Sequence, residues 1–162
     1  MAPRVTPVEL ADLDELALVD GRYAHTMGDE VIVTRSSVHF YQRSGHSFAA
    51  REDGGVRGFV LAHASWSGGR PVVRVERLAG DTAAARPLVE AVVKSAYDAG
   101  VYDIVATVPD GDGTARDAFN GASFEQRPVS VVGRVLGSRG AHTSSGPATD
   151  DGSVTGSPIK GG

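Results

Sequence analysis

The sequence predicts an α+β (mixed α/β) domain, and two observations carry this prediction. Three strand-like segments separated by glycine-rich turns fill much of the first half, which is typical of an antiparallel meander. A long apolar helix pattern and another strand-like segment follow, and a strand–helix–strand connection of this length is normally parallel and right-handed. We therefore expect a mixed, mostly antiparallel sheet with a central parallel strand pair and flanking helices.

The first segments predict one strand and two helices. Residues 4–6 are expected to form a short strand, and residues 7–20 a first helix, whose Thr-Pro-Val-Glu start combines capping-box spacing with proline at the first helical position. Leucines then recur at helical spacing, and Gly21 is expected to end the helix. A second short helix is expected at 35–44, closed by Gly45.

Three strands are expected next, at 47–51, 56–65 and 71–78. A Glu-Asp-Gly-Gly turn separates the first two and a Ser-Gly-Gly turn the last two, and such turns favour hairpins. The three strands should therefore be antiparallel neighbours.

The second half of the sequence alternates between helix and strand. Apolar residues at helical spacing predict a largely buried helix over 84–99, and Gly100 should end it. The remaining expected elements are a strand at 103–108, a short helix at 114–120, and final strands at 123–126 and 129–136. The strand at 103–108 should pair in parallel with 71–78.

Composition places the folded part in residues 1–136. Of the last 26 residues, 17 are Gly, Ser, Thr or Pro, so we expect 137–162 to be a disordered Gly/Ser-rich tail. The chain has no cysteine, which excludes a disulfide framework and a thiol nucleophile. Its formal charge of −4 argues against nonspecific nucleic-acid binding.

No targeting or membrane signal is recognisable. The first residues lack the apolar region of a secretory signal, and the longest apolar stretch, near 59–64, is far shorter than the roughly 20 residues of a membrane span. Histidines lack metal-ligand spacing, so no metal is expected. We therefore expect a cytoplasmic protein with no membrane and no nucleic-acid partner.

Residues 48–59 combine a strand, an acidic glycine turn and a Gly-Phe pair that opens the next strand. Together with the long apolar helix at 84–99 and Ser123-Phe124, they resemble the GNAT N-acetyltransferase superfamily over about residues 3–136. Segments 43–48 and 93–102 are also similar to a small uncharacterised GNAT-like group. The resemblance implies a GNAT-like fold, acetyl-CoA as co-substrate, and direct acyl transfer to an amine.

The resemblance also implies a cofactor loop at the start of the long helix, where N–H groups and small residues admit a pyrophosphate. The cofactor candidates are Arg77, Leu78, Ala79, Gly80, Asp81, Thr82 and Arg86. The carboxylate of Asp81 would repel the anion, and Asp81 or Thr82 could simply cap the helix. Because Pro87 lacks an N–H, the helix is expected to begin near Ala84 or to be kinked.

Two residues are candidates for the base that takes the proton of the amine. Glu76 precedes the cofactor loop, and His63 lies on the neighbouring strand; either could instead be a polar residue on the solvated face of the sheet. The family often has a tyrosine acid where this chain has Phe119, which has no proton to donate. Tyr97, Tyr102, Tyr41 or water would have to replace it.

Aromatic side chains mark the expected acceptor side. Tyr23, Tyr41 and Trp66, with Phe40, fall where the family binds its acceptor, although core packing or a dimer contact explains them equally well. Two functions follow. The first is an acetyl-CoA-dependent N-acetyltransferase acting on a small-molecule amine or a protein amine. The alternative is a catalytically degenerate acyl-CoA-binding or dimeric assembly module, so a homodimer is among the expected partners.

Overall fold

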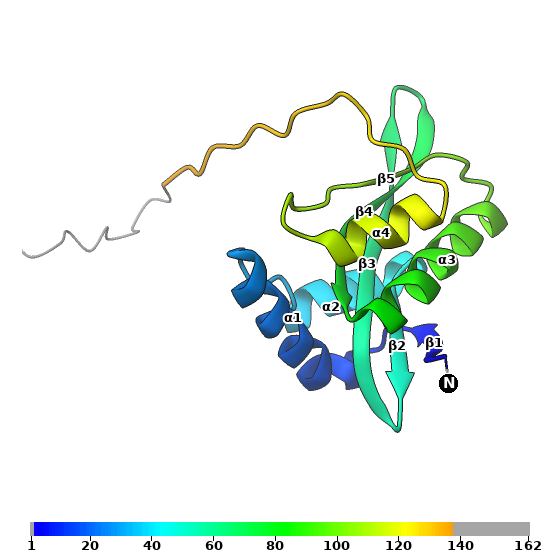
Figure 1. The fold of residues 1–162 in the computed structure, drawn as a ribbon. Coiled ribbons are helices and arrows are strands. Elements are labelled where there is room, and N and C mark those ends of the chain that lie inside the picture. The colour runs from blue at the N-terminus through cyan, green and yellow to red at the C-terminus, as the bar shows by residue number, and fades with distance from the viewer. Residues whose placement is uncertain (1, 138–162) are drawn as a thin grey trace, which may run out of the picture. The chain divides into compact units, whose positions relative to one another are not determined.

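The computed structural model describes residues 2–137, and Figure 1 shows their fold. In chain order the elements are β1 (Arg4–Pro7), a 3-10 turn (Leu10–Asp12), α1 (Leu13–Met27), α2 (Arg35–Ser44), β2 (Phe48–Glu52), β3 (Gly55–Ser67), β4 (Arg70–Gly80), α3 (Thr82–Asp98), β5 (Ile104–Ala106) and α4 (Gly113–Gly121). All of these elements belong to one compact unit, Met1–Gln126. The second unit, Arg127–Gly162, has no helix or strand in its described part.

The sheet has five strands in the order β1-β2-β3-β4-β5. The first four are antiparallel neighbours, and β4 pairs with β5 in parallel, as predicted. Asp53 and Gly54 close the β2–β3 hairpin with positive φ angles of 52° and 81°, which explains the Asp-Gly sequence at this turn.

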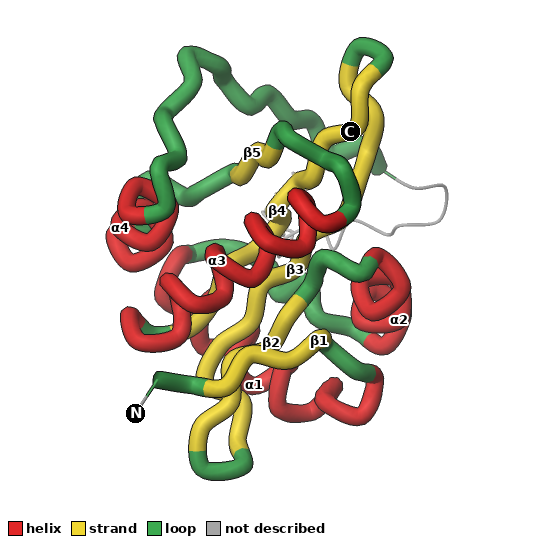
Figure 2. Tube along the Cα trace, turned by 90° about the vertical axis from the view of Figure 1, so that its right-hand side faces the viewer, coloured by secondary structure: helices red, strands yellow, loops and turns green. Residues whose placement is uncertain are grey.

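Helices cover both faces of the sheet, as Figure 2 shows. On one face α3 and α4 pack against side chains such as Val60 and Val73, which retain no exposed surface. On the other face α1 and α2 cover Phe59 and Leu61, which are also fully buried. The alternation of Phe59, Val60 and Leu61 along β3 therefore fills two separate cores.

The first helix begins and ends later than predicted. Residues 4–7 are held in the sheet by pairing with β2, so the chain cannot turn helical at Pro7. The capping box lies instead between Glu9 and Asp12, in front of the 3-10 turn. Gly21 lies inside α1, and it is Gly28, with a φ of 64°, that ends the helix.

α3 begins at Thr82 rather than near Ala84, with Pro87 inside the helix, so the later start is not observed. The prediction of two final strands is wrong. Residues 123–126 and 129–136 are not strands: the part of the chain described after α4 has no strand, so β5 is the last strand of the sheet. The predicted tail lies outside the described residues, apart from Gly137. Among the helices that the structure describes, none is long and apolar enough to cross a membrane.

Candidate active site

The site is built on an irregularity in β4. Leu61 pairs with Arg77 and Ala62 with Val75, so Glu76 is an extra residue of β4 in this ladder, a β-bulge. On its other side β4 pairs with β5 only up to Val75↔Ala106, and then continues to Gly80. Bulges commonly lie beside functional sites, because they redirect side chains and interrupt pairing.

Glu76 and His63, the two candidate bases, lie side by side at this bulge. His63 Nε2 is 3.1 Å from Glu76 Oε1, and its Nδ1 is 3.3 Å from the carbonyl oxygen of Ala64. Both oxygens can only accept, so a neutral imidazole donates to one of them and an imidazolium to both. A proton taken from a substrate amine could therefore be held on either member of the pair.

Aromatic rings from α2 enclose His63 on one side. The ring centroids of Phe40 and Tyr41 lie 5.6 Å and 6.2 Å from that of His63. Burial, and then the negative charge of Glu76, raise the pKa of Tyr41, and they outweigh the opposing effect of Arg77. Trp66 lies elsewhere: it pairs with Pro71 near the far end of the hairpin and is 74% exposed.

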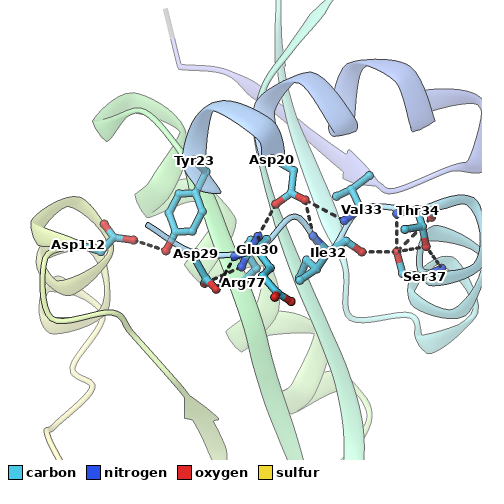
Figure 3. Close-up of polar contacts among 10 residues, drawn as sticks. All are labelled: Asp20, Tyr23, Asp29, Glu30, Ile32, Val33, Thr34, Ser37, Arg77 and Asp112. Atoms are coloured by element: carbon cyan, nitrogen blue, oxygen red, sulfur yellow. Dashed lines mark hydrogen bonds and ion pairs between the residues drawn. The ribbon is translucent and has the colours of Figure 1, made fainter. Parts of the chain in front are cut away.

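Both terminal nitrogens of Arg77 are engaged inside the protein, as Figure 3 shows. The side chain is only 5% exposed; its guanidinium donates to Asp20 at 2.6 Å and to Asp29 at 2.8 Å, and lies 5.1 Å from the ring centroid of Tyr23. The other oxygen of Asp20 accepts from the N–H groups of Ile32 and Val33. Arg77 thus fastens α1 and the following loop to β4, and its terminal nitrogens are not available to a cofactor.

Tyr23 belongs to the same network and links it to α4. Its hydroxyl donates to Asp112 Oδ2 at 2.8 Å, while Asp112 Oδ1 accepts from the N–H of Ala115 at 2.9 Å. Asp112 is therefore the N-cap of α4, a role that the sequence signals by an aspartate before Gly-Thr-Ala. We did not predict that it would bond Tyr23, because 89 residues separate the two.

The start of α3 has the helix cap that was predicted as one alternative for this loop. Asp81 is the N-cap and accepts from the N–H of Ala84 at 3.0 Å, which bears out the capping alternative. Arg57 forms an ion pair with Asp81 and another with Glu52, so the negative charge of the cap is offset. Thr82 is exposed, and its N–H belongs to the first turn, where helices have no internal acceptor.

The small residues of the loop have a packing role. A Cβ atom at Gly80, whose φ is 145°, would lie 2.8 Å from the Cα of Gly58. Leu78 and Ala79 are buried in the two cores, and exposed Arg86 pairs with Glu90 at 2.8 Å.

The position of the usual tyrosine acid is occupied by a core residue. Phe119 is 6% exposed, and its ring centroid lies 5.0 Å from that of Phe124. Of the tyrosines named as substitutes, Tyr97 and Tyr102 are exposed and contact each other, with centroids 5.9 Å apart. Tyr41 is the one beside the His63–Glu76 pair.

The architecture is that of the GNAT acetyltransferases. A ribosomal-protein-alanine N-acetyltransferase from Brucella melitensis biovar Abortus 2308 superposes with a TM-score of 0.67 at 18% identity, over 83% of this chain and 100% of that chain. A protein described as a predicted acetyltransferase from Clostridium acetobutylicum, solved with acetyl-CoA, gives 0.62 at 10% identity, over 81% and 95%.

More specifically, the chain belongs to the family described as protein of unknown function DUF1999, whose model matches residues 20–147. It is also similar to wild-type TTHA1254 from Thermus thermophilus, with 37% identity over 84% of this chain and 99% of that chain and a TM-score of 0.72. Comparison of the sequence with curated proteins gave no match.

Proposed function

We propose that the protein is a GNAT-type N-acyltransferase that transfers an acetyl group from acetyl-CoA directly to an amine. The observation that carries this proposal is the His63–Glu76 pair, held at 3.1 Å on the bulge of β4 within an acetyltransferase fold. A general base must reach the proton that it removes, and a bulge beside a partly paired strand is a suitable position for it.

The residues at the start of α3 fit a pyrophosphate in part. The exposed first turn at Thr82 offers N–H donors and the positive end of the helix dipole. The carboxylate of Asp81 opposes an anion, and Arg57, which also pairs with Glu52, offsets part of its charge. We therefore assign cofactor binding to the backbone of 78–82 and leave Arg77 out. The pantetheine arm would lie where β4 extends beyond β5.

The chemistry requires little from the chain beyond proton transfer and orientation. The amine nitrogen attacks the thioester carbonyl carbon, a C–N bond forms, and the C–S bond breaks. The amine proton passes to Glu76 or to the imidazole of His63. The leaving thiolate takes a proton from water or from Tyr41, although the raised pKa makes Tyr41 a weaker donor than an ordinary tyrosine. No covalent enzyme intermediate is needed, and the chain has no cysteine to form one.

The acceptor would approach from the side of α2. Phe40 and Tyr41 offer apolar surface there, and Tyr23 lines the neighbouring network, so we propose a small-molecule or protein amine with an apolar portion. We also propose that the protein belongs to the small GNAT-like group that segments 43–48 and 93–102 resemble. Its proposed location is the cytoplasm.

Release of free CoA thiol in the presence of acetyl-CoA and a panel of amines and peptides tests the proposal. Turnover that depends on one class of amine is expected. Binding of acetyl-CoA without turnover on any amine would favour the second function.

That second function is a catalytically degenerate assembly or acyl-CoA-binding module, and one observation favours it. Five apolar side chains after α4 are each at least 72% exposed: Val129, Val131, Val132, Val135 and Leu136. Exposed apolar clusters commonly mark interaction surfaces. Light scattering tests this role. A wild-type homodimer that becomes a monomer on Val131→Ser substitution would support an assembly role for this segment.

A further inference from the structure

A groove lies along the second half of α3, away from the start of that helix. It has a volume of about 650 Å³ and is lined by residues of α3, β1, β2 and the segment before β2. Val5, Phe48 and Ala91 give it apolar walls, and His46 and Ser95 are its inner polar residues. Grooves of roughly 300–1,000 Å³ with apolar walls and few polar groups are typical of small-molecule sites.

The hydrogen bonds of His46 fix which ring nitrogen carries the proton. Ser95 Oγ donates its single proton to the carbonyl oxygen of Gly45 at 2.9 Å. The same Oγ lies 2.5 Å from Nδ1 of His46. In a neutral ring, both contacts are hydrogen bonds only if Nδ1 carries the proton and donates to Oγ, and this is the tautomer that we infer. Nε2 is then an unprotonated acceptor.

Nε2 has no hydrogen-bond partner within the described residues, although His46 is only 7% exposed. None of the fully buried side-chain nitrogens and oxygens in this part of the chain lacks a partner. Nε2 therefore retains some surface accessible to solvent, and His46 is one of the residues that line the groove. A buried ring with one open acceptor is a group suited to a ligand's donor.

We propose that this groove binds a small neutral molecule that has an apolar body and one hydroxyl or N–H group, which donates to Nε2 of His46. Charge is not required of the ligand, because Lys94 and Asp98 at the groove pair with each other. Burial lowers the pKa of His46, so the ring is neutral and able to accept at neutral pH. The site is separate from the His63–Glu76 pair and does not depend on the proposed transferase activity.

Phenol and anisole make a matched pair of probes, because O-methylation removes the donor and keeps the ring. With ¹⁵N-labelled protein, the long-range ¹H–¹⁵N spectrum of the free protein should show the Nδ1–H tautomer of His46. Phenol should shift the Nε2 signal in a saturable manner, and anisole should bind about three- to tenfold more weakly. An Nε2–H tautomer, or equal effects of the two probes at His46, would overturn the proposal.

Ser95→Ala extends the test. Without the hydroxyl that accepts from Nδ1, the Nε2–H form of His46 should become populated, and phenol should lose its advantage over anisole. Ser36→Ala, at an exposed position in α2, is the matched control and should preserve both the tautomer and the preference. If Ser95→Ala preserves them as well, the bonding assigned to His46 is wrong. If this variant does not fold, the tautomer of His46 in the wild-type spectrum is the test of the proposed bonding.

Discussion

Tyr23 and Asp112 are joined by a hydrogen bond of 2.8 Å across 89 residues of sequence. The bond ties the middle of α1 to the first turn of α4, which Asp112 also caps. Burial raises the pKa of Tyr23, and the hydrogen bond to Asp112 raises it further, so the hydroxyl remains protonated. Arg77, the residue that follows Glu76, is held by Asp20 and Asp29, so one network links α1, α4 and the end of the bulge.

Tyr23→Phe should lower the free energy of unfolding by about 1–2 kcal/mol, because a buried acceptor on Asp112 loses its donor. Urea unfolding measures the change. Tyr97→Phe removes an exposed hydroxyl and should remain within about 0.5 kcal/mol of wild type. Equal effects of the two substitutions would contradict the linking role of Tyr23.

Arg77→Met should be far more destabilising, by about 3–5 kcal/mol, because it leaves the fully buried Asp20 without its cation. Adding Asp20→Asn should recover part of the loss, since the buried charge is then gone. Arg74→Met, an exposed neighbour on β4, serves as the control. If Arg77→Met were as stable as the control, the guanidinium would not be engaged as described, and its exclusion from the cofactor site would be wrong.

Glu76→Gln should lower kcat/KM for acetyl transfer by about 10²–10⁴-fold, which is the usual contribution of a general base. Binding of acetyl-CoA should be unaffected, because Glu76 is assigned to the acceptor's proton. Glu125→Gln, at an exposed position after α4, should leave both properties unchanged. Full activity of Glu76→Gln combined with loss of activity in His63→Gln would assign the base to the histidine alone.

Stability should fall on acidification through His46. Burial lowers its pKa in the folded protein below the ordinary value near 6.5, so the unfolded chain takes up the proton first. The stabilisation that comes from keeping His46 neutral is fully present above pH 6.5. It is lost as the pH falls from 6.5 to the pKa of His46 in the folded protein. His46→Asn, which cannot titrate, should reduce the slope of stability against pH below 6.5, whereas Ser36→Asn, at an exposed position in α2, should not reduce it. An unchanged slope in His46→Asn would contradict the assignment of this pH dependence to His46.

Local signals in the sequence predicted most of the sheet correctly. Some features depend only on a few neighbouring residues, and local patterns therefore predict them. They are the Asp-Gly turn, the helix end at Gly45 and the apolar run of α3. The sequence placed His63 and Glu76 on neighbouring strands, but it did not predict their pairing. That contact depends on the register, in which His63 lies opposite Arg74, and on the bulge at Glu76.

The errors arose where distant contacts decide the structure. Pairing of β1 with β2 kept Pro7 out of a helix, which no local pattern indicates. Arg77 matched a cofactor motif, yet carboxylates 57 and 48 residues away engage it. The segment 129–136 is rich in valine, as strands often are, but a strand also needs a partner, and the described residues supply none.

Thermal unfolding with and without acetyl-CoA tests the central claim most directly. At 100 times its Kd, a ligand adds about 2.7 kcal/mol of stability, which should raise the Tm by roughly 5–10 °C. Thr82→Glu should abolish the shift, because it places a carboxylate at the proposed pyrophosphate site while remaining compatible with a helix N-terminus. Ser36→Glu, on the first turn of α2, should retain it. An unchanged Tm of the wild type in millimolar acetyl-CoA would contradict the account.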